Sequence, residues 1–273
     1  LRKKIESNST SLKDLNLKIY IGLLNGYNDA FVIDTKTKNE LIKQNPKSSE
    51  IIQQMLRGRD VGKYYLNWQD TWLINSHNGI KNKFSRVDVP KDFPAVYNHL
   101  LQFKEPLKIR YNQGSHWTNL RNCIYFNEFK KPKIIWGELS DLPKFAYDDK
   151  GFVPEATLFA MIGDDLKYLL GILNSKIALW YFEQISTSSG MGTNRWKKYK
   201  IEQLPIKNSN EKKMNEIISV VDKIIAITNS NNYLSNPEKQ SQIFQLEQSV
   251  DKLVYNLYDL SLEEIEIIEN ALN

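Results

Sequence analysis

The sequence predicts an α+β fold, in which a mixed α/β body is followed by an antiparallel helical hairpin and a short C-terminal helix. Three observations predict it. Short apolar runs bounded by turn signals recur between residues 17 and 162, a long apolar helical pattern follows, and beyond Pro205 apolar residues repeat at steps of three and four. We therefore divide the chain into a body of residues 1–206 and a helical arm of residues 207–273.

The body is predicted to be a mixed sheet with helices attached. Asn25-Gly26 is a strong tight-turn signal, so we expect the two runs beside it to form a hairpin. Strands are expected at residues 17–24, 30–34, 71–74, 133–136, 145–147 and 157–162. Helices are expected at residues 35–44, 48–56 and 93–104, and as one long helix that Asp164 or Asp165 caps and that runs through Trp180.

The arm is predicted to be two helices folded back on each other as a coiled coil. The apolar positions of the first lie within residues 214–224 and those of the second within residues 243–257, with a polar loop at 229–237. Ser261 and Glu264 have the spacing of a capping box and predict a last short helix. We expect the outer face of the hairpin to dock on the body or on a catalytic part of a longer protein.

Composition restricts the class of protein and its compartment. The 273 residues are 41% apolar, enough for a substantial core, and the net charge is only +5. Charge is unevenly distributed along the chain. The charged residues of 104–133 are mainly basic, whereas residues 259–273 hold five acids and no Lys or Arg. Cys123 is the only cysteine, and no apolar run is long enough to span a bilayer. The chain starts at Leu1, so we expect a piece of a longer cytoplasmic protein.

Residues 186–206 carry the strongest signal for a polyanion. Ser, Thr and Gly fill the first half, and a cluster of cations with aromatic neighbours fills the second. Such a cluster suits phosphates by charge and bases by stacking or edge contacts. The alternative is a solvated hinge loop before an amphipathic strand, with Trp196 packed beneath it. The candidate DNA contacts here are Arg195, Trp196, Lys197, Lys198 and Lys200.

Two further stretches are candidate DNA-facing surfaces. The second surface lies in an irregular basic run, and its aromatic residues could equally be core; its candidates are Arg110, Tyr111, His116, Trp117 and Arg121. The third lies in the polar loop 75–86, where phosphate contacts are expected from Lys81, Lys83 and Arg86. Arg57, Arg59 and Asp60 are interpreted as structural, an ion pair or turn brace under the sheet.

Catalytic chemistry is not visible in the sequence. Gly190-Met191-Gly192 lacks the third glycine and the preceding strand of a dinucleotide loop, and no phosphate-cradling loop is present. The three histidines are far apart, and neither Asn-Pro pair continues as a methyltransferase motif would require. We expect no catalytic residue, no metal site and no cofactor in this chain.

Five segments in order resemble a known family. They are IYIGLLNGYNDAFVID (19–34), LRGRDVGKYY (56–65), KIIW (133–136), LLGILNSKIALWYF (169–182) and WKKYKIEQLPI (196–206). Together they resemble the TaqI-like C-terminal specificity domain of type IIG restriction–modification enzymes and related adenine DNA methyltransferases. The tail LVYNLYDLSLEEIEIIE (253–269) is similar to the ending of those enzymes. The family's usual Thr-Gly is Asn25-Gly26 here, and its LPIP ends in Lys207.

The resemblance implies a target recognition domain in residues 1–206 and a spacer or docking arm in residues 207–273. The expected partners are double-stranded DNA and the methyltransferase and nuclease domains of a bacterial or archaeal parent protein. S-adenosylmethionine and magnesium are expected only in those other domains. Two alternatives stay open: a piece like the specificity subunit of a type I restriction system, and a coiled-coil protein-interaction module that does not bind DNA.

Overall fold

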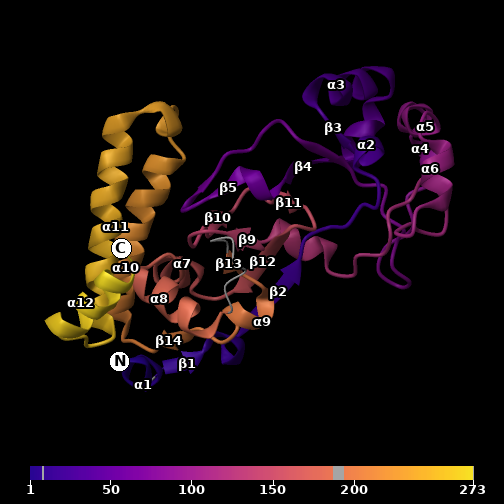
Figure 1. The fold of residues 1–273 in the computed structure, drawn as a ribbon. Helices are drawn as coiled ribbons and strands as arrows, with labels where there is room; N and C mark the ends of the chain where they lie inside the picture. Colours follow the sequence, from indigo (N-terminus) through magenta and orange to yellow (C-terminus); the bar gives the residue numbers. More distant parts are fainter. Residues whose placement is uncertain (8, 187–193, 273) are drawn as a thin grey trace.

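The computed structural model describes residues 1–7, 9–186 and 194–272 and has the predicted α+β architecture. Figure 1 shows a central body with a helical hairpin along one side and a smaller, mainly helical lobe on the other. The N-terminal helix α1 (Arg2–Glu6) is tied to the C-terminal region by an ion pair between Lys4 and Glu264 at 2.5 Å. Within the described residues no helix combines the length and the apolarity needed to cross a bilayer.

The main sheet has the strand order β10-β8-β12-β2 with antiparallel neighbours throughout. Ala160 in its centre lies opposite Ile135 on one side and Tyr20 on the other. Two apolar helices cover the sheet, and their side chains share its core. The strands and helices of this part are β2 (Leu17–Ile21), β8 (Lys133–Gly137), β10 (Ala146–Asp148), β12 (Leu158–Gly163), α7 (Leu166–Leu173) and α8 (Lys176–Ile185).

A second sheet, with the order β11-β4-β7-β3, leads into the smaller lobe. Only its β11–β4 pair is parallel. Short helices surround a separate apolar core in this lobe (Figure 1). The elements are β3 (Val32–Ile33), β4 (Ile52–Leu56), β7 (Trp72–Ile74), β11 (Val153–Pro154), α2 (Asn28–Phe31), α3 (Thr35–Gln44), α4 (Val89–Asp92), α5 (Pro94–Leu101) and α6 (Lys104–Ile109).

Of the two-stranded ladders in the described residues, β1–β14 and β9–β13 join distant segments, whereas β5–β6 is a local pair. Pairing of β1 with β14 fixes the N-terminal segment against the end of the body, and β9 pairs with β13 next to the basic segment. The elements are β1 (Ser9–Ser11), β14 (Pro205–Lys207), β9 (Leu139–Ser140), β13 (Asn194–Arg195), β5 (Val61–Gly62), β6 (Tyr65–Leu66) and the short helix α9 (Lys198–Ile201).

The arm consists of α10 (Glu211–Thr228), α11 (Pro237–Leu257) and α12 (Leu262–Ala271), and the capping box of Ser261 and Glu264 is confirmed. The hairpin packs on α7 at Gly171, where an added Cβ would come within 2.7 Å of Ile217 and 3.2 Å of Val221. Glycine therefore allows the close approach. The hairpin shares one hydrophobic core with the body, so the change of character after residue 206 is not a break in packing.

Three local predictions are wrong. The Asn25-Gly26 turn exists, with Gly26 at φ +78°, but β2 and β3 belong to different sheets and short helix α2 intervenes. Residues 48–56 form a 3₁₀ segment and strand β4 instead of a helix. The long apolar helix is two helices, because Asn174 ends α7 and the Ser175 hydroxyl caps α8. The helix over residues 35–44 is confirmed.

Candidate nucleic-acid interface

Residues 75–87 and 110–122, hereafter the paired loops, are interlocked by buried polar groups. Asn119 is fully buried; its amide donates to the carbonyls of Ser76 (3.1 Å) and Val87 (2.9 Å), and its oxygen accepts from Arg86 (2.9 Å). The Ser76 hydroxyl donates to the Thr118 carbonyl at 2.6 Å. Two stretches that the sequence showed only as separate candidate surfaces therefore form one surface.

Arg110 anchors the paired loops from below and is unavailable to DNA. Its guanidinium donates to the carbonyls of Asn25, Trp117 and Asn119 and lies 4.4 Å from the centre of the Phe31 ring. Burial lowers the pKa of Arg110 to about 10. The predicted DNA contact by Arg110 is replaced by a structural role, because the side chain is only 7% exposed and its hydrogen bonds go to the backbone.

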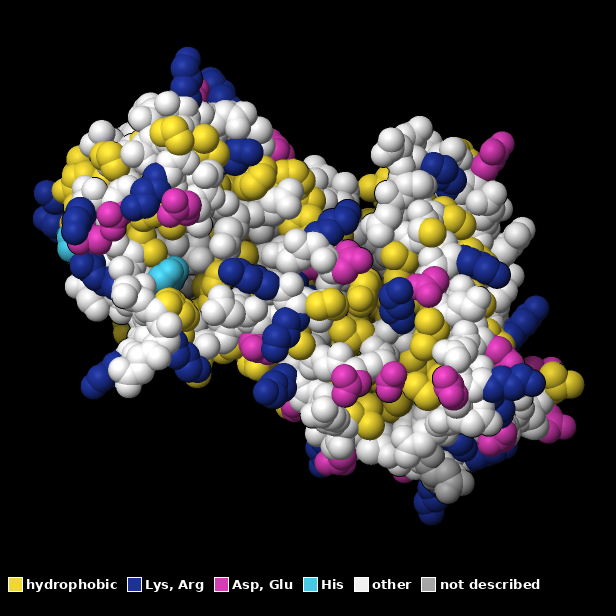
Figure 2. All heavy atoms as spheres, turned by 180° about the vertical axis from the view of Figure 1, so that it is seen from behind, with side chains coloured by type: hydrophobic (Ala, Val, Ile, Leu, Met, Phe, Trp, Pro, Cys, Tyr) yellow, Lys and Arg dark blue, Asp and Glu magenta, His cyan; other side chains and the backbone are white. Residues whose placement is uncertain are grey.

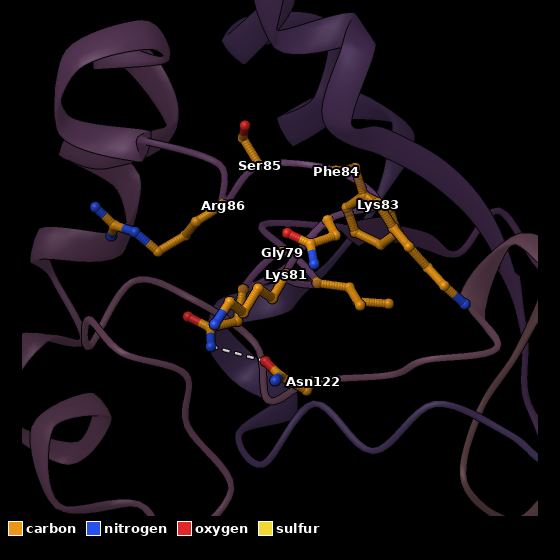
Figure 3. Close-up of a pocket in the computed structure, with 10 residues that line it drawn as sticks. Gly79, Lys81, Lys83, Phe84, Ser85, Arg86 and Asn122 are labelled. Carbon is orange, nitrogen blue, oxygen red and sulfur yellow. Dashed lines mark hydrogen bonds between the residues drawn. The ribbon is translucent and has the colours of Figure 1, made fainter.

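The outer face of the paired loops keeps its cations exposed. Lys81, Lys83 and Arg86 surround a shallow hollow of about 520 Å³, together with Asn78 and Asn122, whose amides are joined by a 2.7 Å hydrogen bond. In Figure 3 the side chains of Lys83 and Arg86 extend in opposite directions from the loop, so positive charge is spread over its width. A surface of this kind suits a phosphate backbone, with the amides available as donors and acceptors to base edges.

The other predicted residues of the second surface differ in exposure. Arg121 is exposed and donates to the Asn112 amide oxygen at 3.1 Å, and Tyr111 is 96% exposed. His116 and Trp117 are half-buried with ring centres 5.4 Å apart, and a His116 ring nitrogen lies 2.8 Å from the Thr118 hydroxyl. Burial, and secondarily the charge of Arg86, lowers the pKa of His116, so it is neutral at pH 7.

The basic segment 194–201 lies beside β9, and residues 187–193, which include most of its predicted flexible half, are outside the described residues. Arg195 and Lys197 both approach the Glu138 carboxylate, at 3.5 and 3.7 Å, and both are at least one third exposed. Lys198 donates to the Ile19 carbonyl at 3.2 Å, and Lys200 donates to the carbonyl of Ile185. Exposed ion pairs of this geometry contribute little stability, so Arg195 and Lys197 can exchange Glu138 for phosphates.

Trp196, also predicted as a DNA contact, packs beneath this segment. It is 1% exposed, and its ring stacks on Phe182 with centres 3.9 Å apart. Its indole donates to the Ser140 carbonyl at 3.1 Å, and its own carbonyl accepts from Trp136 at 2.8 Å. The structure therefore selects the alternative in which Trp196 fixes the base of the segment, and its side chain reaches no ligand.

A short stretch of backbone connects the basic segment with the paired loops. Ile19 accepts from Lys198, and Asn25 accepts from Arg110. Six residues of extended chain span at most about 22 Å, which is less than the roughly 34 Å of one turn of B-DNA. The two anchoring carbonyls therefore lie within the length of one turn of B-DNA. Figure 2 shows Lys and Arg side chains on the smaller lobe and across its junction with the body.

Sequence reasoning missed the residues that organise this surface. Asn119, Ser76 and Asn78 are uncharged, and nothing in their spacing distinguishes them from ordinary loop residues; the only available signal was the density of Asn in the two loops. No group of three His, Cys, Asp or Glu side chains able to hold a metal occurs within residues 1–7, 9–186 and 194–272. The paired loops offer binding groups, and their charged side chains are all cations.

Comparison with known proteins identifies the family of this chain. Residues 53–206, more than half of the chain, match the TaqI-like C-terminal specificity domain. The match includes both paired loops and the basic segment. The chain belongs to the family of TaqI-like C-terminal specificity domains.

Particular relatives are longer proteins. The chain is 21% identical to the type II methyltransferase M.BstVI of Geobacillus stearothermophilus over 93% of its own length and 41% of that protein. It is 22% identical to M.XhoI of Xanthomonas vasicola over 72% of the chain and 35% of that methyltransferase. The fold is similar to the type IIL restriction–modification enzyme MmeI, solved in complex with DNA, with a TM-score of 0.67, 14% identity and coverage of 92% of this chain and 34% of that one. The chain thus spans less than half of these relatives.

Proposed function

We propose that this chain is the double-stranded DNA target recognition part of a longer restriction–modification enzyme or DNA methyltransferase. The observation that carries the proposal is the paired loops, which lie inside the family match and present exposed cations and amides on one polar-anchored surface. The curated relatives are methyltransferases, and the chain covers only 41% and 35% of them. The recognition part would direct chemistry carried out elsewhere in such a protein.

Roles within the surface follow from exposure and chemistry. Lys81 and Lys83 are assigned to phosphates, since an ammonium is a flexible point charge. Arg195 and Asn122 are assigned to base edges, because a guanidinium or an amide meets two acceptor or donor groups at once. Lys197, Lys198 and Lys200 complete the phosphate contacts on the other side, and His116, Trp117 and Arg121 are further candidate contacts within the paired loops.

Binding in this proposal is tested with duplex DNA at several salt concentrations, using fluorescence anisotropy. Replacing Lys81 or Lys83 by Ala should weaken binding to cognate and random duplexes alike. It should also lower the slope of log affinity against log salt concentration by about 0.9 for each phosphate that the lysine neutralised. Lys252→Ala is the matched control, an exposed lysine on the hairpin. Wild-type affinity that does not depend on salt, or equal weakening in Lys252→Ala, would contradict the proposal.

Arg195 separates reading from positioning. Arg195→Ala should cost about 1–3 kcal/mol of binding free energy on the cognate duplex only, relaxing preference at one base pair. The cognate site is found by selection from random duplexes. An equal loss of affinity for all sequences would show that Arg195 contacts a phosphate. The residues that read bases would then be sought in the paired loops.

We also propose that the chain is not an enzyme by itself and binds no cofactor, with S-adenosylmethionine and magnesium held by other domains of the parent protein. The proposal is supported by the family, a specificity domain. Label transfer from tritiated S-adenosylmethionine to DNA, or cleavage of plasmid with magnesium, by the purified chain would overturn it.

The alternative of a pure interaction module is weakened by the packing of the hairpin. Its apolar seam faces α7 and α8, where Ile217, Val221 and Val250 are buried. A coiled coil that captured a partner would need that face free. The outer face of the arm remains available to the parent's other domains.

A further inference from the structure

Ile109 and Tyr111 form an exposed apolar prong at the edge of the paired loops. Their exposed fractions are 85% and 96%, and no other large apolar side chain in the described part of the chain is as exposed as Tyr111. A single exposed apolar side chain is ordinary on a protein surface, but here two of them flank a buried arginine and form a local apolar projection. The prong is therefore a candidate contact for a binding partner.

The backbone beneath the prong is held in place. Arg110 follows the end of α6 in an extended conformation (φ −63°, ψ 140°), and its side chain is buried while those of its neighbours Ile109 and Tyr111 are exposed. The inward Arg110 is held by three carbonyls. Asn112 accepts from Arg121 and packs on Gly26, where an added Cβ would come within 2.7 Å of the Asn112 carbonyl oxygen.

The surroundings of the prong favour nucleic acid as its occupant. Lys108 precedes the prong in the chain, and Arg121 is brought beside it by its hydrogen bond to Asn112; both cations are exposed, and so is Glu105, which pairs with Lys108 at 3.4 Å. A solvent-exposed ion pair such as Lys108–Glu105 is weak. Lys108 and the exposed Arg121 can therefore both contact phosphates. An apolar tip bordered by cations is the arrangement of proteins that insert a wedge between base pairs.

We propose that Tyr111, with Ile109 beside it, inserts at one base step of the duplex and stacks on the unstacked base. The inference rests on the proposed DNA-binding function and adds a mode of recognition to it. An aromatic face carries no donor or acceptor code, so the prong selects sequence through the ease of unstacking. Pyrimidine–purine steps unstack most readily, and the selected site should contain one opposite the prong.

The test is a mismatch scan with the full chain. A single mismatch is moved through the duplex selected from random sequences, and the affinity is measured for each position. Most mismatches should weaken binding, but one at the wedged step should strengthen it, because the unstacking cost is reduced there. Tyr111→Ala should bind the matched duplex about 5- to 150-fold more weakly, the equivalent of 1–3 kcal/mol, and should not show the gain. Tyr111→Phe should keep both.

Phe244→Ala is the matched control, because Phe244 is an aromatic residue 61% exposed on the hairpin. Equal losses of affinity in Tyr111→Ala and Phe244→Ala would overturn the wedge. So would a Tyr111→Ala protein with wild-type affinity and mismatch profile, and in that case salt-dependent wild-type binding would leave the proposed function standing. Absence of wild-type binding to every duplex would overturn both.

Discussion

The paired loops and the helical hairpin are stabilised in opposite ways. In the loops Asn119, Arg110 and Ser76 are buried and satisfy backbone carbonyls. The hairpin instead packs apolar side chains against α7, with Gly171 allowing the close contact. Its main polar exception is Asp251, which accepts from the backbone amide of Lys176 at the start of α8.

The difference matters for function. Apolar packing is non-directional and tolerates changes that conserve volume, so the hairpin suits a stable support. Buried hydrogen bonds are directional, and loss of one partner leaves the other unsatisfied. The paired loops therefore hold one shape beneath exposed groups that can vary, which is what a surface specific for one DNA sequence needs.

The largest expected effect is on the hairpin. Ile224 is fully buried, and Ile224→Ala should lower the free energy of unfolding by about 2–5 kcal/mol, while DNA affinity of the folded protein stays unchanged. Leu246, which the heptad pattern places in the seam, is only half-buried, so Leu246→Ala should lower the free energy of unfolding by less. Urea unfolding of both variants measures the difference, and equal losses would show that the seam follows the heptads instead of the observed burial.

A smaller loss of stability with a larger loss of function is expected in the paired loops. Asn119→Ala removes the side-chain donor to the Val87 carbonyl and the acceptor of the Arg86 guanidinium, and should cost about 1–3 kcal/mol of unfolding free energy. It should also weaken DNA binding, unlike Ile224→Ala. Asn215→Ala, an exposed asparagine on α10, is the control. Unchanged DNA affinity in folded Asn119→Ala would separate the loop network from recognition.

The last prediction concerns the pH dependence of the buried charge of the hairpin. Burial raises the pKa of Asp251 from its ordinary value of 3.8 to about 6. The folded state then holds a proton that the unfolded state releases, so this contribution to stability is present below about pH 4 and disappears as the pH rises to about 6. Asp251→Asn keeps an acceptor for Lys176 and should remove this slope, worth on the order of 3 kcal/mol for a shift of about two pKa units. Parallel stability–pH curves for the wild type and Asp251→Asn would show that another group causes the pH dependence.

Prediction from sequence succeeded where one periodicity governs a long segment. The helix at residues 35–44, both hairpin helices and the Ser261 capping box depend on local spacing and local hydrogen bonds. It failed where contacts with a segment distant in sequence select the secondary structure. Residues 48–56 are apolar enough for either a helix or a strand, and pairing of Ile52 with Ile74 across the sheet selects the strand.

The Asn25-Gly26 turn illustrates the same limit. Its sequence determined a left-handed glycine, but the direction of the chain after it depended on two sheets and on Arg110, which is 85 positions away from Asn25 and bonds to its carbonyl. Trp196 and Arg110 are residue types that commonly contact DNA. Only the tertiary structure shows that both are buried.

By itself the sequence determined the α+β class, the helical arm, the ordered segments that resemble the specificity domain and the basic character of the loops, since these follow from local patterns along the chain. The tertiary structure decided which basic residues remain exposed, and it joined residues 75–87 to residues 110–122 into one surface. The physical reason is that a buried hydrogen bond needs a partner at a particular place in space, and the residues that supply it are distant in sequence.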